Sequence, residues 1–167
     1  LYGWMGFLAI LLLVWRIKIA GMLLHLIAQL GLSMTFLALV TGSIWGKPMW
    51  GAWWVWDARL TSELVLFLLY GSILATYAAV KNKENADKII AILILVGLID
   101  LPIIHYSVYW WNTLHQGSTF TVTDRPAMPP EMYLPLIVML FGCYAFFAAV
   151  VIARTRNEIM QQIGRAH

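Results

Sequence analysis

Charged residues are scarce in this sequence. They make up 11% of its 167 residues, whereas apolar residues make up 62%. A soluble domain typically carries about 25% charged residues, so this composition excludes an ordinary soluble fold. We therefore expect one integral membrane domain over residues 1–167, surrounded by lipid, and no nucleic-acid partner.

Cysteine is scarcer still. The only one, Cys143, has no partner for an intramolecular disulfide. The sequence lacks a Cys-x-x-Cys-His motif and any Cys/His cluster with zinc spacing, which excludes covalent haem attachment and a zinc finger. The run from Gly42 to Lys47 is one residue short of a phosphate loop and is followed by Pro48 instead of Ser or Thr, so we discard it.

Five apolar stretches can cross a membrane or come close to doing so. A spanning helix needs about 20 residues, because the hydrocarbon layer is roughly 30 Å thick. The stretches cover residues 1–15, 21–42, 60–80, 89–106 and 133–153. We predict an all-α, polytopic helical membrane protein of about five transmembrane helices. Because Leu1 opens inside an apolar run without a methionine, we expect the sequence to begin partway through a longer protein; a signal peptide is the alternative.

Basic residues are distributed unevenly between the connections. With alternating sides, one side holds eight Lys and Arg residues and the other only Lys47, Arg59 and Arg125. The positive-inside rule makes the first side cytoplasmic. The loops over residues 45–59 and 106–132 are therefore expected to face outward, into the periplasm of a bacterial inner membrane or its mitochondrial equivalent.

The first outward loop is dense in tryptophan. Five of the fifteen residues in 45–59 are tryptophan, and an aromatic belt at the membrane surface explains only one or two of them. The density favours a binding surface for a flat aromatic ligand such as porphyrin, because indole rings are wide, rigid and polarisable. Gly46 and Gly51 would let the backbone approach such a ligand closely.

The second outward loop adds Trp110, Trp111 and two histidines. Neutral imidazole is a common axial ligand of haem iron. His115 is the better candidate, because polar neighbours (Asn112, Gln116, Ser118) can hold its other ring nitrogen. His105 closes the fourth predicted helix, where a structural role is expected.

Two charged residues are open to two interpretations. Arg59, like Lys47 and Arg125, can pair with a porphyrin carboxylate, or it can form an ion pair with Asp57 or Glu63. Asp100, which we place in the outward third of its helix, can steer a proton or cation, or can be satisfied by water and Trp or Tyr donors.

The segment WGAWWVWDARLTSELVLFLLY, followed after about thirty residues by LPIIHYSVYWWNTLHQGS, resembles the haem-handling WWD family, and within it the CcmC family of system I cytochrome c maturation. Asp57 is followed by Ala58, whereas other branches usually have proline there, which favours CcmC. The resemblance covers essentially the whole chain.

The resemblance implies a function and a site. It implies that haem is held transiently and non-covalently, as a b-type haem, and presented to the chaperone CcmE, with CcmA, CcmB and CcmD as further partners. It implies delivery, not enzymatic turnover. His115 matches one axial ligand, while the family's second axial histidine lies upstream of the first helix and is absent from this sequence. If the sequence is nevertheless complete, His105 or a partner is expected to provide the second ligand. The predicted haem-contacting residues are Trp50, Trp53, Trp54, Trp56, Asp57, Arg59 and His115.

Two other functions are compatible with a membrane protein of this composition. The membrane domain of a small-molecule exporter would show a polar stripe through the helices, which here carry few charges besides Glu63 and Asp100. A membrane redox enzyme would need two intramembrane histidines on facing helices for a b-type haem, and only His25 lies well inside a span.

Overall fold

The computed structural model describes residues 1–111, 115 and 128–165, and within these ranges it contains helices and no strand. The helices are α1 (Tyr2–Trp15), α2 (Lys18–Trp50), α3 (Ala58–Ala79), α4 (Lys83–Gly97), α5 (Asp100–Trp110) and α6 (Pro130–Arg165). Four apolar helical stretches are long enough to cross a membrane: α2, α3, α4 together with α5, and α6. Helix α1 is apolar but shorter. The protein is a polytopic helical membrane protein, as predicted.

The chain divides into two compact units, Leu1–His115 and Gln116–His167. The first contains α1 to α5. In the second, the apolar helix α6 has no buried residue in its spanning window. A single membrane domain over residues 1–167 stays a prediction.

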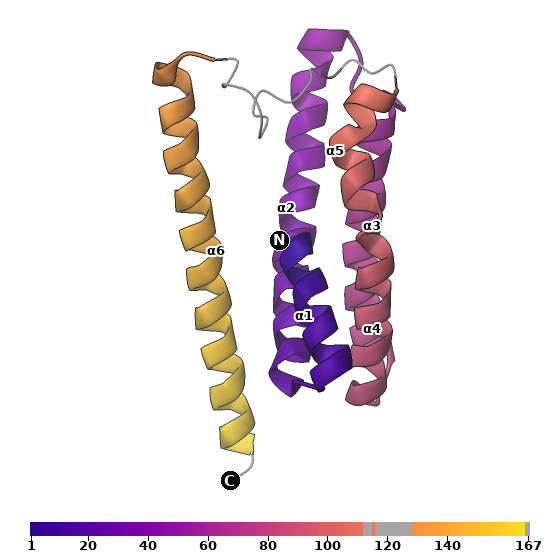
Figure 1. The fold of residues 1–167 in the computed structure, drawn as a ribbon, viewed down its shortest axis with the longest axis vertical. Coiled ribbons are helices and arrows are strands. Elements are labelled where there is room, and N and C mark those ends of the chain that lie inside the picture. Colours follow the sequence, from indigo (N-terminus) through magenta and orange to yellow (C-terminus); the bar gives the residue numbers. More distant parts are fainter. Residues whose placement is uncertain (112–114, 116–127, 166–167) are drawn as a thin grey trace. The chain divides into compact units, whose positions relative to one another are not determined.

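Within the Leu1–His115 unit, successive long helices run in opposite directions (Figure 1). The α1–α2 and α3–α4 connections therefore lie at one end of this unit, which we call the basic end because it carries Arg16, Lys18, Lys81 and Lys83. The α2–α3 connection and the end of α5 lie at the opposite, aromatic end. This grouping agrees with the predicted alternation of the connections.

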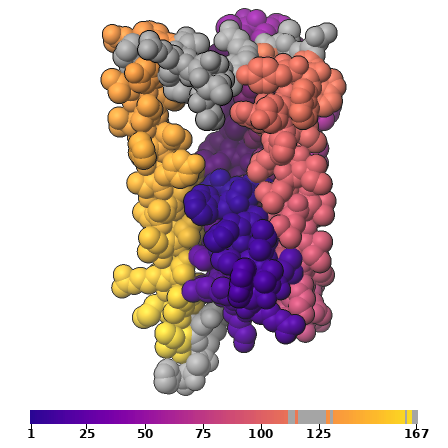
Figure 2. Space-filling model, in the orientation of Figure 1, coloured from indigo at the N-terminus to yellow at the C-terminus, as the bar shows by residue number. Residues whose placement is uncertain are grey.

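Small residues let the helices of this unit pack closely. Gly31 of α2 lies against the ring of Tyr70 of α3, where a Cβ atom would collide with the ring. Helix α1 packs against α2 and α4. It has 14 residues and α2 has 33, so it covers only part of α2, whose atoms lie behind α1 in Figure 2. The core is formed by all four helices α1, α2, α3 and α4, and its side chains include Met5, Leu24, Ile73, Ile90 and Ile94.

The first outward connection is shorter than predicted. Helix α2 continues past Gly42 to Trp50, so residues 45–50 are helical and only residues 51–57 connect α2 to α3. Pro48 does not end the helix earlier, because a proline removes only one hydrogen bond and lies here in the last turn. At the second connection, residues 106–110 likewise belong to α5.

The fourth predicted helix consists of two. Helix α4 ends at Gly97 and α5 begins at Asp100. Pro102, in the first turn of α5, has no N–H to donate to the Leu98 carbonyl, which accepts instead from Leu101 N at 3.3 Å. The predicted span over 89–106 lies within one apolar membrane-crossing stretch, Lys83–Trp110, which is interrupted at Leu98 and Ile99.

Candidate functional site

The aromatic end begins where α2 stops. Gly51 has a left-handed backbone with φ of 77°, a conformation that glycine adopts without steric cost, and its N–H donates to the Lys47 carbonyl at 3.0 Å. The Lys47 ammonium donates back to the Gly51 carbonyl at 3.0 Å. These two hydrogen bonds fix the direction in which the tryptophan-rich segment leaves α2.

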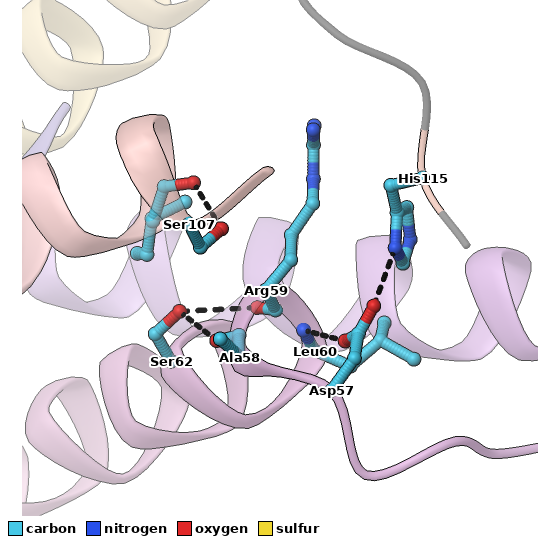
Figure 3. A network of polar contacts seen from close by, with 8 residues as sticks. Asp57, Ala58, Arg59, Leu60, Ser62, Ser107 and His115 are labelled. Carbon is cyan, nitrogen blue, oxygen red and sulfur yellow. Dashed lines mark hydrogen bonds and ion pairs between the residues drawn. The ribbon is translucent and has the colours of Figure 1, made fainter. Parts of the chain in front are cut away.

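Asp57 has two roles at the start of α3. Its Oδ1 accepts a hydrogen bond from Leu60 N at 2.8 Å, which makes it the N-cap of the helix. Its Oδ2 lies 2.7 Å from Nδ1 of His115, a residue 58 positions later (Figure 3). The Asp57 side chain is 5% exposed and the His115 side chain 18% exposed, so this contact is largely shielded from solvent.

Trp50 packs edge-on against the imidazole ring of His115. Its ring centroid lies 4.7 Å from that of His115 and 5.2 Å from that of Trp45. Gly46 leaves room for the Trp50 ring, because a Cβ atom there would lie 3.1 Å from it. The imidazole is therefore held by a carboxylate through Nδ1 and by an indole from the side.

The other tryptophans of the segment differ in exposure. Trp53 and Trp56 are 59% and 75% exposed, and the Lys47 ammonium lies 6.0 Å above the Trp53 ring. Trp54 is half-buried and packs edge-on against Trp56 at 5.4 Å. Its indole Nε1 is buried and has no hydrogen-bond partner within the described part of the chain. The segment thus presents two open indole faces and one buried N–H donor.

Arg59 projects from the first turn of α3 and is exposed (Figure 3). Across the described ranges it forms no ion pair with Asp57 or Glu63, one of the two alternatives considered for it. Asp57 contacts His115 instead. Pairing of Arg59 with a ligand carboxylate stays a prediction.

The two histidines of the second outward loop differ in environment. His105 lies within α5, is exposed, and packs edge-on against Tyr106. His115 is largely buried and contacts the carboxylate of Asp57 through Nδ1. The expected polar neighbours of His115 (Asn112, Gln116, Ser118) and Arg125 lie outside the described residues. Asp57 could not be predicted from the sequence as the partner of His115, because the two are 58 positions apart in the chain.

A second aromatic group closes α5. Trp110 stacks on Tyr106, with centroids 5.4 Å apart, and lies edge-on to Trp111 at 5.9 Å. Both tryptophans are more than half exposed. Within the described ranges, no three His, Cys, Asp or Glu side chains cluster as they would around a bound metal ion. The arrangement suits a planar ligand with one imidazole contact better than a multidentate metal site.

Comparison with known proteins identifies the family. The family model described as "CcmC: Heme exporter protein C" matches residues 1–167. Proteins named Heme exporter protein C are 47% identical over 161 residues in Haemophilus influenzae and 48% identical over 160 residues in Escherichia coli K12. Each alignment covers 96% of this chain but only 65% and 64% of the respective relative. A relative of the same name in Bradyrhizobium diazoefficiens is 43% identical, with 96% of this chain and 61% of the relative covered. The chain therefore belongs to the heme exporter protein C family.

Proposed function

We propose that this chain binds haem at its aromatic end and presents it for transfer to the chaperone CcmE. The observation that carries the proposal is the 2.7 Å contact between Asp57 Oδ2 and His115 Nδ1 beside the Trp50 ring. The family membership supports a haem-related role in a membrane.

The Asp57–His115 contact suits metal coordination through Nε2. Metal-binding histidines commonly donate their second ring N–H to a carboxylate, which fixes the tautomer and makes the ligating nitrogen more basic. Asp57 is itself fixed by the Leu60 N–H. His115 is thereby suited to be one axial ligand of haem iron, as the sequence predicts.

The tryptophans supply the planar contact. Trp53 and Trp56 have exposed ring faces on which haem can stack, and Trp50 packs against the imidazole of His115. Trp54 has a buried indole N–H without a partner in the described residues, which can donate to the ligand. Stacking on indole faces is non-covalent, so haem held by stacking and one imidazole can be released. Arg59 is the cation of this segment that can pair with a haem carboxylate. Reversible holding fits delivery, and we propose no enzymatic turnover.

The proposed orientation places the aromatic end on the periplasmic face of a bacterial inner membrane. The basic residues at the opposite end support it through the positive-inside rule. Transfer to CcmE would then occur on the outer face, with CcmA, CcmB and CcmD as the other components.

A haem titration of the purified chain in detergent, followed by visible absorbance, tests the proposal. We expect a Soret shift in the parent protein and a weaker or altered shift in His115→Ala. His105→Ala is the matched control, because His105 is exposed on the neighbouring helix and should leave the spectrum unchanged. An equal spectrum for the parent and His115→Ala would contradict the proposed ligand.

A further inference from the structure

A second group of polar residues lies inside the Leu1–His115 unit, away from the aromatic end. Asp100 is the first residue of α5 and Trp110 the last. At about 1.5 Å per residue, they are about 15 Å apart along the helix. Asp100 therefore lies about three helical turns from the aromatic end of α5. Its position in the outward third of the span stays a prediction.

Two polar atoms in this group are buried without a partner. Asp100 is 9% exposed and Tyr2 of α1 is 3% exposed. Neither Asp100 Oδ2 nor the Tyr2 hydroxyl has a hydrogen-bond partner among the residues whose positions are described. Buried polar groups nearly always have a partner, so two exceptions in one region require an explanation. Among the described residues, no Trp or Tyr side chain donates to Asp100 Oδ2, and its satisfaction by water stays a prediction.

The surrounding helices hold both side chains in place. The Tyr2 ring packs edge-on against Tyr70 of α3 at 5.3 Å. The Tyr2 hydroxyl lies against Gly97, at the end of α4, where a Cβ atom would collide with it. Asp100 follows directly after the break between α4 and α5. The packing of the helices therefore fixes the position of Tyr2, and the start of α5 fixes that of Asp100.

The charges around Asp100 disfavour a carboxylate. Glu63 of α3 lies within electrostatic range of both Asp100 and Arg59, and Arg59 is placed to compensate the charge of Glu63. No Lys or Arg side chain in the described ranges forms an ion pair with Asp100. The negative end of the α4 dipole and the positive end of the α5 dipole meet here, so their partial charges largely cancel. An unpaired carboxylate in hydrocarbon is costly, and the group is more stable when neutral.

We propose that Asp100 is a protonated carboxyl group at neutral pH and forms, with Tyr2, a proton-binding site inside the membrane. The proton is held on Asp100 alone or shared with a water molecule between Asp100 and the Tyr2 hydroxyl. Glu63, five residues into α3, lies within electrostatic range of Asp100 and can exchange a proton with it. The site is independent of haem binding.

Infrared spectroscopy of the full chain in lipid nanodiscs, without haem, tests this proposal. The chain has only eight Asp and Glu residues, so the carbonyl band of a protonated acid can be assigned by substitution. We expect this band at neutral pH, a shift of the band in D2O, and its loss in Asp100→Asn. Asparagine resembles the neutral acid in size and polarity, so this variant should fold.

Glu84→Gln is the control, because Glu84 is an exposed acid paired with Lys88 and should leave the band unchanged. In Tyr2→Phe, a frequency shift would indicate the shared water molecule, and an unchanged frequency would place the proton on Asp100 alone. The absence of the band in the parent, or its persistence in Asp100→Asn, would overturn the proposal.

Discussion

The two ends of the Leu1–His115 unit can be compared turn by turn. At the basic end, Arg16 is the C-cap of α1, with φ of 53°, and Asn82 is the N-cap of α4. At the aromatic end, Gly51 is the C-cap of α2, with φ of 77°, and Asp57 is the N-cap of α3. Both ends thus use a left-handed C-cap and an N-cap side chain that accepts a backbone hydrogen bond, but the cap residues differ in their burial and in their other contacts.

The two N-caps show what the difference means. Asn82 is exposed and, in addition to its cap bond to Asn85 N, holds no other described side chain. Asp57 is buried, caps α3, and also holds His115. Capping alone needs neither burial nor charge, so the burial of Asp57 and its contact with His115 fit the role in the proposed haem site.

Replacing Asp57 by asparagine should have the largest effect on haem binding among the capping variants. Asparagine caps a helix about as well as aspartate, so α3 should remain intact, whereas the charged partner of His115 is lost. We expect haem affinity to fall about 10-fold to 100-fold, the usual cost of losing such a supporting partner. Titration followed at the Soret band measures this change, and unchanged affinity would reduce Asp57 to a cap like Asn82.

The two helix ends with left-handed backbone should respond in opposite directions. Gly51→Ala puts a side chain in this conformation and should lower the free energy of unfolding by about 1–2 kcal/mol, while Arg16→Gly should raise it by up to a similar amount. Unfolding in a denaturing detergent, followed by circular dichroism, measures both. An unchanged free energy of unfolding in Gly51→Ala would mean that the connection adjusts and that the glycine is not needed for the turn.

Removing an open indole should weaken haem binding moderately. Trp56 is 75% exposed and, among the described residues, its ring contact is with Trp54. Trp56→Ala should therefore leave the fold intact. Loss of one aromatic contact costs about 1 kcal/mol, or roughly a 5-fold decrease in haem affinity. Trp4→Ala is the control, because Trp4 is 62% exposed on α1. If both variants bind haem as the parent does, the tryptophans serve as a membrane belt only.

The smallest expected effect belongs to the cap at the basic end. Asn82→Ala should lower the free energy of unfolding by about 1 kcal/mol through loss of the cap, with no change in haem affinity. The same detergent unfolding and haem titration check both parts. A large loss of haem affinity in Asn82→Ala would show that binding reports general stability, which would remove the contrast between the two ends.

The membrane-spanning helices could be predicted because lipid sets their length and composition. The five predicted spans correspond to α1, α2, α3, the α4–α5 pair and α6. The end of α2 could not be predicted in the same way, since Gly46 and Pro48 occur in loops as well as in the last turns of helices. The break at Leu98 and Ile99 was missed, although Pro102 accounts for it.

The site could be predicted in its parts but not in its connections. The tryptophans and His115 were found because their residue types are unusual at that density. The contact of Asp57 with His115 depends on how α3 and α5 pack, which no local pattern encodes. The contact between the Tyr2 hydroxyl of α1 and Gly97 of α4 likewise depends on how two helices pack.

The central claim is that Asp57 acts on haem through His115. A double-mutant cycle tests it most directly, with haem affinity measured for the parent, Asp57→Asn, His115→Ala and the double variant. We predict that Asp57→Asn lowers affinity in the parent but has no further effect once His115 is alanine. Equal losses with and without His115 would contradict the account, because Asp57 would then act independently of the imidazole.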